Sequence, residues 1–178
     1  DIDSANRNLY NADFRVVVTN YETGRPAYLS VKKNGWINSI EATGSLPVAT
    51  RGYCRLAGKK YIDGGLSDPL PVKRVYDWGY RKVVLLRTNP EDLEPNWNIE
   101  SLYAPYFYKD NPKIQKLIAR NDKIYTNSQK YISNPSTNMK IVQVAPKELL
   151  KCGVIANNIE HIKADYRYGL EMGLDSIQ

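Results

Sequence analysis

The sequence predicts an α/β fold, and three patterns carry that prediction. Short runs rich in β-branched and apolar residues, such as 14–20 and 83–86, are typical of buried strands. Other segments carry apolar residues at helical spacing, and 112–131 is the longest of them. Proline and glycine stand between most of these segments and mark turns. The order strand, helix, strand over residues 60–86 indicates a βαβ-like unit, and therefore parallel pairing.

The composition is that of a folded chain with a core of its own. The chain has 178 residues, of which 42% are hydrophobic. Its 25 basic and 19 acidic residues leave a net charge of +6, but the basic residues form no dense run. This charge is compatible with two interpretations: a protein that binds an anionic membrane surface, and an ordinary basic protein without such a partner. No nucleic-acid motif is present, so we expect no nucleic-acid partner.

The chain has few cysteine and histidine residues for disulfides or a zinc site. The chain has two cysteines, Cys54 and Cys152, and one histidine, His161. These are too few for a disulfide framework or a zinc site, so we expect two reduced thiols and neither metal nor cofactor. No apolar run reaches the length of a membrane span. The expected location is cytoplasmic or peripheral to a membrane.

The first third of the chain predicts a hairpin followed by a helix. Residues 14–20 and 27–31 are the two strands, and the turn between them contains Gly24. A helix is expected over 36–43, ended by Gly44, because glycine often follows the last helical turn. Its apolar side is expected to be Trp36, Ile37 and Ile40.

The middle of the chain predicts a strand, a helix and a second strand. A short strand over 60–62 runs into an Asp-Gly-Gly turn, and Pro71 opens a helix that ends near Gly79. Residues 83–86 are continuously apolar, as in a strand buried on both faces of a parallel sheet. A surface excursion is expected over 89–111, with aromatics that either form an interfacial patch or fold back onto the domain: Tyr103, Tyr106, Phe107 and Tyr108.

The last third predicts two helices and a strand. Residues 112–131 are expected to form one amphipathic helix. The segment 140–178 holds the final strand, 140–144, and a last helix over 158–172 with Asn157 as its cap. The residues of that helix expected to face inward are Ile159, Ile162, Tyr166 and Leu170.

The candidate catalytic residues lie around the Asp-Gly-Gly turn. Asp63 ends a strand, and Gly64 and Gly65 let the backbone turn sharply and permit a close approach. In open α/β sheets, ligands bind outside the carboxyl ends of the strands, where a general base would be placed. The alternative is a turn aspartate that hydrogen-bonds its own loop.

The motif and its surroundings resemble those of bacterial patatin-like phospholipases. Residues 61–65, followed by Ser67-Asp68-Pro69, resemble the Asp-Gly-Gly block of that family. Segments 18–26, 41–47 and 79–85 resemble its upstream strand and turn, its small-residue segment and the strand after its loop. Residues 141–173 resemble the last strand and helix of one bacterial subgroup, so the resemblance covers nearly the whole chain in the same order.

The resemblance implies a fold and a reaction. The fold would be a mainly parallel sheet between helices, with residues 1–178 as the C-terminal part of a single hydrolase domain. The reaction would be the hydrolysis of a lipid acyl ester by a Ser-Asp dyad without histidine. Asp63 would be the base, Gly64 and Gly65 would shape its turn, and the substrate would be a lipid or another acyl ester.

The chain departs from the family pattern in one respect. No GxSxG nucleophile motif and no glycine-rich oxyanion loop occur in these residues. We expect both to lie N-terminal to residue 1, so the missing N-terminal half would be a partner and this chain alone would be inactive. Ser67 is expected to be a loop residue, Ser45 a cap or turn residue, and His161 a surface or packed residue. The alternative function is a non-catalytic patatin-like fold that binds a partner or a membrane surface.

Overall fold

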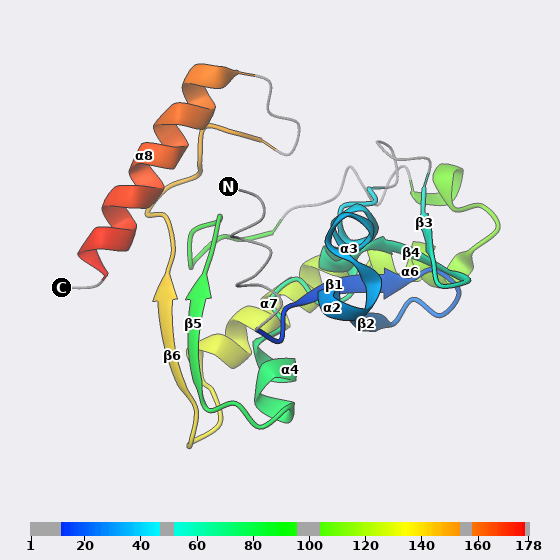
Figure 1. The fold of residues 1–178 in the computed structure, drawn as a ribbon, viewed down its shortest axis with the longest axis horizontal. Helices are drawn as coiled ribbons and strands as arrows, with labels where there is room; N and C mark the ends of the chain where they lie inside the picture. The colour runs from blue at the N-terminus through cyan, green and yellow to red at the C-terminus, as the bar shows by residue number, and fades with distance from the viewer. Residues whose placement is uncertain (1–11, 47–51, 96–103, 154–157, 177–178) are drawn as a thin grey trace. The chain divides into compact units, whose positions relative to one another are not determined.

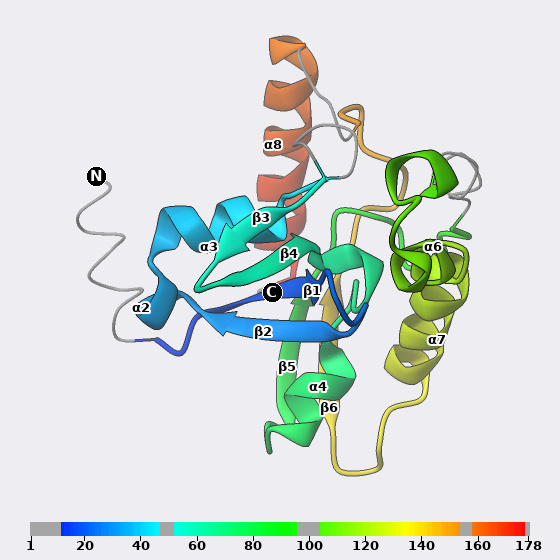
Figure 2. The same cartoon turned by 90° about the vertical axis from the view of Figure 1, so that its right-hand side faces the viewer.

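The computed structural model describes residues 12–46, 52–95, 104–153 and 158–176 (Figures 1 and 2). They form a mixed α/β structure with two separate sheets. The chain divides into two compact units, Asp1–Pro71 with Pro95–Ser128, and Val72–Glu94 with Gln129–Gln178. No helix in the described ranges is both long and apolar enough to cross a membrane.

A four-stranded antiparallel sheet is the centre of the first unit. Its strand order is β2-β1-β4-β3, and the predicted hairpin is confirmed as the pair β1 and β2. Gly24 lies in the turn of the hairpin with a positive φ of 67°, which glycine adopts without strain. The strands are β1 (Arg15–Asn20), β2 (Pro26–Ser30), β3 (Cys54–Leu56) and β4 (Lys59–Asp63).

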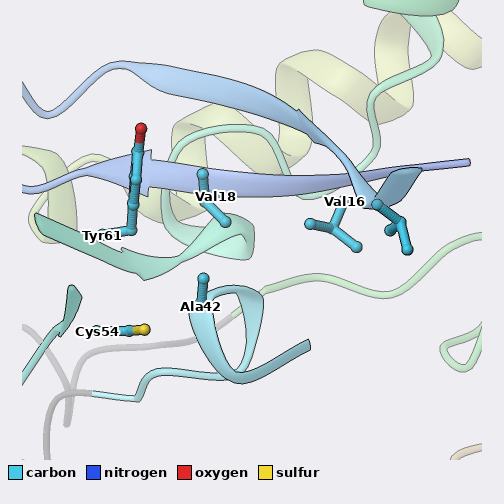
Figure 3. Close-up of a cluster of buried hydrophobic side chains, with 6 residues drawn as sticks. Val16, Val18, Ala42, Cys54 and Tyr61 are labelled. Carbon is cyan, nitrogen blue, oxygen red and sulfur yellow. The ribbon is translucent and has the colours of Figure 1, made fainter. Parts of the chain in front are cut away.

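Strand β4 contributes side chains to two clusters of buried residues. Because successive side chains of a strand point to opposite faces, Tyr61 and Ile62 enter different clusters. Figure 3 shows the Tyr61 cluster, in which a helix residue, Ala42, faces the sheet. The other members of the Tyr61 cluster are Val16, Val18, Val31 and Cys54. The Ile62 cluster contains Ala104, Tyr108, Ile114 and Ile118.

Two helices precede β3. The short α2 (Val31–Asn34) leads into α3 (Trp36–Thr43), which has the predicted bounds. The predicted orientation of α3 is wrong, since its buried residues are Ser39 and Ala42. These small side chains let the helix approach the sheet closely, and the Ser39 hydroxyl is satisfied by donating to the Gly35 carbonyl at 2.6 Å. The residues expected to be inward are exposed instead: Trp36, Ile37 and Ile40.

The single helix predicted over 112–131 is wrong, because two helices occupy this segment. They are α6 (Pro112–Ile118) and α7 (Asn121–Ser133). The break follows from Asn121, whose side chain reaches out of the helix to two carbonyls of another segment. Asn111 caps α6 by accepting the Ile114 amide at 3.3 Å.

Part of the predicted surface excursion 89–111 belongs to the core. Residues 104–107 are helical, and Ala104 and Tyr108 are buried. Tyr106 and Phe107 are exposed and contact each other edge to face. Tyr103 lies outside the described residues. The alternative in which the aromatics fold back onto the domain is confirmed for Tyr108, which packs in the Ile62 cluster, so a patch of all four aromatics does not form.

The second unit contains a two-stranded parallel sheet. Strand β5 (Lys82–Leu86) pairs with β6 (Lys140–Val144), and α4 (Val72–Asp77) precedes β5. The predicted βαβ-like unit over 60–86 is wrong, because β4 and β5 belong to different sheets. Three of the four described strand pairings are antiparallel, so these residues do not form a mainly parallel sheet.

The apolar residues of the second unit are largely exposed. Val84, Leu86 and Val142 are exposed, so the prediction of a strand buried on both faces is wrong. The last helix, α8 (Ile159–Asp175), has no buried residue, although four of its residues were expected inward. Its cap is Asn158 rather than Asn157, because the Asn158 side chain accepts two backbone amides. The exposed apolar side of α8 consists of Ile159, Ile162, Tyr166, Leu170 and Leu174.

Candidate active site

Asp63 is held firmly at the end of β4. Its side chain caps the short 3₁₀ helix η1 (Gly64–Leu66), since Oδ1 accepts the Gly65 amide at 2.7 Å. Its own amide donates to the Ser45 carbonyl at 3.0 Å. The carboxylate is therefore fixed through one oxygen, and its backbone is anchored to the residues that follow α3.

A buried threonine holds this turn by a hydrogen bond from its side chain. Thr19 is fully buried in β1, and its hydroxyl donates to the Asp63 carbonyl at 2.7 Å. The Ser67 hydroxyl lies 2.8 Å from the same Thr19 oxygen. Because the single Thr19 proton goes to the carbonyl, Ser67 must be the donor in that pair. Ser67 is thus a loop residue, as expected, and it makes no hydrogen bond to the Asp63 carboxylate.

Gly64 is required by the close approach of β1. A Cβ atom at this position would lie 2.2 Å from the Val17 carbonyl oxygen and 2.5 Å from its carbon. No side chain fits at such distances, so the turn can adopt this path only with glycine. On the other side of the turn, the Asn121 amide donates to the carbonyls of Gly65 and Leu66, each at 3.0 Å.

Burial and hydrogen bonding act on Asp63 in opposite directions. Desolvation raises the pKa of its carboxyl, and the hydrogen bond from the Gly65 amide lowers it, with the rise prevailing. Among the described residues, no donor is bonded to the second oxygen, Oδ2. A half-buried carboxylate with one held oxygen and one free oxygen can accept a proton from a group placed beside it.

We expect Asp63→Asn to stabilise the fold near neutral pH. The substitution keeps an oxygen that can accept the Gly65 amide and removes a partly desolvated charge. Because the pKa of Asp63 is raised in the folded state, its contribution to stability is complete below about pH 4 and declines as the pH rises through the folded value. Thermal melts of both proteins should therefore differ more at about pH 7 than at about pH 4, with the Asn variant the more stable. Equal differences at both pH values would contradict the raised pKa.

The position of Asp63 has a different cause from the one expected. Strand β4 is antiparallel to both of its neighbours, so the rule for the carboxyl ends of parallel strands does not apply to it. The turn itself positions the carboxylate. The Asp63 side chain caps η1, the Thr19 hydroxyl donates to the Asp63 carbonyl, and Gly64 lets the turn lie close to the backbone of β1. The alternative of a turn aspartate is confirmed, since Oδ1 accepts the Gly65 amide of its own loop, and the role of general base stays a prediction.

The other candidate residues lie apart from this carboxylate. The buried Ser45 hydroxyl donates to the Glu41 carbonyl at 2.7 Å, which makes it a cap residue of α3, as expected. Asp68 accepts a hydrogen bond from the Tyr28 hydroxyl. His161 is exposed on α8. Cys54 is a buried free thiol and Cys152 a partly buried one. No three acidic, cysteine or histidine side chains in the described ranges gather as metal ligands would.

Three residues of the site had no predicted role: Thr19, Asn121 and Tyr108. Asn121 interrupted the predicted helix, and asparagine's preference for caps was a usable signal for a break. Thr19 looked like any β-branched strand residue. Tyr108 was assigned to a surface segment, yet it is buried in the cluster that includes Ile62, the neighbour of Asp63.

The comparisons with known proteins give a partial match and one distant relative. A family described as a domain of unknown function (DUF6363) matches residues 111–178. The chain is also 26% identical over 153 residues to a protein of Escherichia coli strain K12 named "Uncharacterized protein YjjU". That match covers 81% of this chain and 41% of the relative, so the chain spans well under half the length of that protein.

Proposed function

We propose that this chain supplies the general base, Asp63, of a patatin-like lipid acyl hydrolase that works through a Ser-Asp dyad. The observation that carries the proposal is the Asp63 carboxylate, which is held through Oδ1, has no donor bonded to Oδ2 among the described residues, and lies on a turn that requires glycine. The resemblance of residues 61–69 to the Asp-Gly-Gly block assigns the reaction class. The nucleophilic serine and the oxyanion hole would come from a segment outside residues 1–178.

The reaction would use Asp63 twice. In the first step the serine hydroxyl gives its proton to Asp63 and its oxygen bonds to the acyl carbon, and the ester bond then breaks as Asp63 protonates the leaving alcohol. In the second step a water gives a proton to Asp63 and attacks the acyl carbon, and the serine regains a proton as the acid leaves. The raised pKa of Asp63 favours the proton-accepting role, since a stronger base takes the serine proton more readily.

The alternative proposal is a non-catalytic module that binds a partner. The exposed apolar residues of β5, β6 and α8 favour it, because isolated domains rarely leave such surfaces uncovered. The same surfaces are also what a domain half would leave open. The E. coli relative is longer than its aligned part and so has room for further segments. The exposed apolar surfaces therefore do not distinguish the two proposed functions. Hydrolysis of an ester distinguishes them.

An activity comparison tests the proposal. The full-length protein that contains this chain should hydrolyse p-nitrophenyl esters, and residues 1–178 alone should give no turnover above buffer. The control is Ser67→Ala in the full-length protein, which removes a loop hydroxyl and should leave most of the activity. A full-length protein without hydrolysis of these esters or of phospholipid vesicles would favour the binding module. Activity of the isolated chain that is lost with Ser67→Ala would contradict the split dyad.

A further inference from the structure

Two positive charges lie opposite each other at the edge of the antiparallel sheet. Strand β3 is the edge strand, beside β4 (Figure 2). Arg55 of β3 is the direct partner of Lys60 in β4, so the two side chains lie on the same face. Like charges in such a cross-strand position destabilise the pair. In the part of the chain that the structure describes, neither side chain forms an ion pair with an acidic residue that would offset this repulsion.

Two tyrosine rings hold these cations in place. The Lys60 Nζ lies 4.7 Å from the ring centroid of Tyr53 and 5.6 Å from that of Tyr21. The Arg55 guanidinium lies 5.4 Å from the same Tyr53 centroid. The two ring centroids are 5.3 Å apart, and both rings pack partly against the Ile62 cluster. Because a ring attracts a cation without neutralising its charge, the rings fix both cations and leave two positive charges for an anion.

A phosphate group matches this pair of cations. A guanidinium donates two parallel hydrogen bonds to phosphate oxygens, and an ammonium adds further donors. Arg55 is exposed, and Lys60 is partly exposed, so a group at the surface can reach both. The hairpin brings no opposing charge, because residues 52–62 contain three basic residues and no acidic one. The cation pair is therefore suited to binding a phosphate from the solvent side.

The neighbouring surface favours a phospholipid headgroup as the source of the phosphate. The Tyr21 ring lies 6.0 Å from that of Tyr108, the residue that follows Tyr106 and Phe107. The side chains of Tyr106 and Phe107 are exposed and contact each other edge to face. Exposed aromatic rings near cations are typical of surfaces that lie at the boundary between lipid headgroups and acyl chains. A free phosphate ion would leave these exposed rings without a role.

We propose that the Arg55–Lys60 pair binds the phosphate of an anionic phospholipid, and that Tyr106 and Phe107 contact the same membrane surface. The attraction is between surface charges, so binding should weaken as the salt concentration rises. The inference goes beyond the proposed function and does not depend on the reaction assigned to Asp63, because lipid binding needs no hydrolysis.

The test is sedimentation of the full-length protein with vesicles. The vesicles contain ether-linked phosphatidylglycerol and phosphatidylcholine in equal amounts, which an acyl hydrolase cannot cleave. Arg55→Gln and Lys60→Gln should each weaken binding about fivefold, the loss typical of one basic residue at an anionic membrane surface. Phe107→Ala should also weaken it, because an apolar contact with the membrane is lost. Vesicles of phosphatidylcholine alone should bind the wild type more weakly than the mixed vesicles.

Arg55→Glu separates lipid binding from folding. A glutamate at this position faces Lys60 and forms a cross-strand pair of opposite charges, which favours the fold. The melting temperature should equal or exceed that of the wild type, whereas vesicle binding should fall about twentyfold or more because the charge changes by two units. The matched control is Lys59→Gln, which removes a charge from the opposite face of the hairpin and should weaken binding less than about twofold.

Three results would overturn the inference. The first is unchanged vesicle binding by a folded Arg55→Glu protein. The second is an equal loss in Lys59→Gln and Lys60→Gln, which would indicate attraction by net charge alone. The third is a wild-type protein that binds inorganic phosphate or a single-stranded oligonucleotide but not the vesicles, which would assign the cations to another source of phosphate.

Discussion

Asp63→Asn in the full-length protein is expected to lower kcat/KM by about a hundredfold or more, the usual loss when general-base help is removed. The substitution nearly preserves the shape of the side chain and keeps an acceptor for the Gly65 amide. Only the basicity of the free oxygen is lost. Because stability near neutral pH should rise rather than fall, the loss of activity would not be explained by unfolding.

Asp68→Asn is the matched control for this prediction. Asp68 lies five residues further along the same loop and accepts a hydrogen bond from Tyr28, which an asparagine oxygen can also accept. Most of the activity should remain. If Asp68→Asn abolishes hydrolysis and Asp63→Asn does not, the base is Asp68. If neither variant affects hydrolysis but Asp63→Asn melts the protein at a lower temperature, Asp63 is a structural residue.

Gly64→Ala is expected to prevent the native turn from forming. Its Cβ would lie 2.2 Å from the Val17 carbonyl oxygen, and this oxygen belongs to the backbone of β1, which cannot move as a flexible side chain can. The strain should cost about 3 kcal/mol or more, and the melting temperature should fall by about 6–12 °C. Thermal unfolding followed by circular dichroism measures this change.

Gly169→Ala provides the comparison for the Gly64 variant. Apart from its chain neighbours and the backbone of its own helix, no atom of the described residues lies within 4 Å of a Cβ placed at Gly169. The residue is in α8, where alanine is the better helix former by about 1 kcal/mol. Its melting temperature should equal or exceed that of the wild type. A Gly64→Ala protein that melts like the wild type would show that β1 and the Asp63 turn are not in close contact.

Local sequence patterns predicted local structure well in this chain. The hairpin of β1 and β2 followed from β-branched strands around Gly24, and α3 followed from apolar spacing ended by Gly44. These features depend on interactions between residues close in sequence. For the same reason the Asp-Gly-Gly turn could be located. The requirement for glycine at position 64 comes instead from the Val17 backbone of β1, which is distant in the sequence.

The incorrect predictions concern contacts between distant residues. Parallel pairing was expected for β4 from the order of elements, but β4 pairs antiparallel with β1 and β3. The apolar stripe of α8 predicts an inward face, yet spacing alone does not say which segment covers that face. The roles of Thr19, Asn121 and Tyr108 also arise from residues more than forty positions away or from burial, which no local pattern encodes.

Covalent labelling of the full-length protein with a fluorophosphonate tests most directly whether Asp63 activates a serine located elsewhere. Intact mass and peptide mapping identify the labelled residue, and the time course gives the rate. We predict a single adduct on a serine outside residues 1–178, formed about a hundredfold more slowly in Asp63→Asn and at nearly the wild-type rate in Asp68→Asn. An adduct on Ser67, or an unchanged labelling rate in Asp63→Asn, would contradict the assignment of Asp63 as the base.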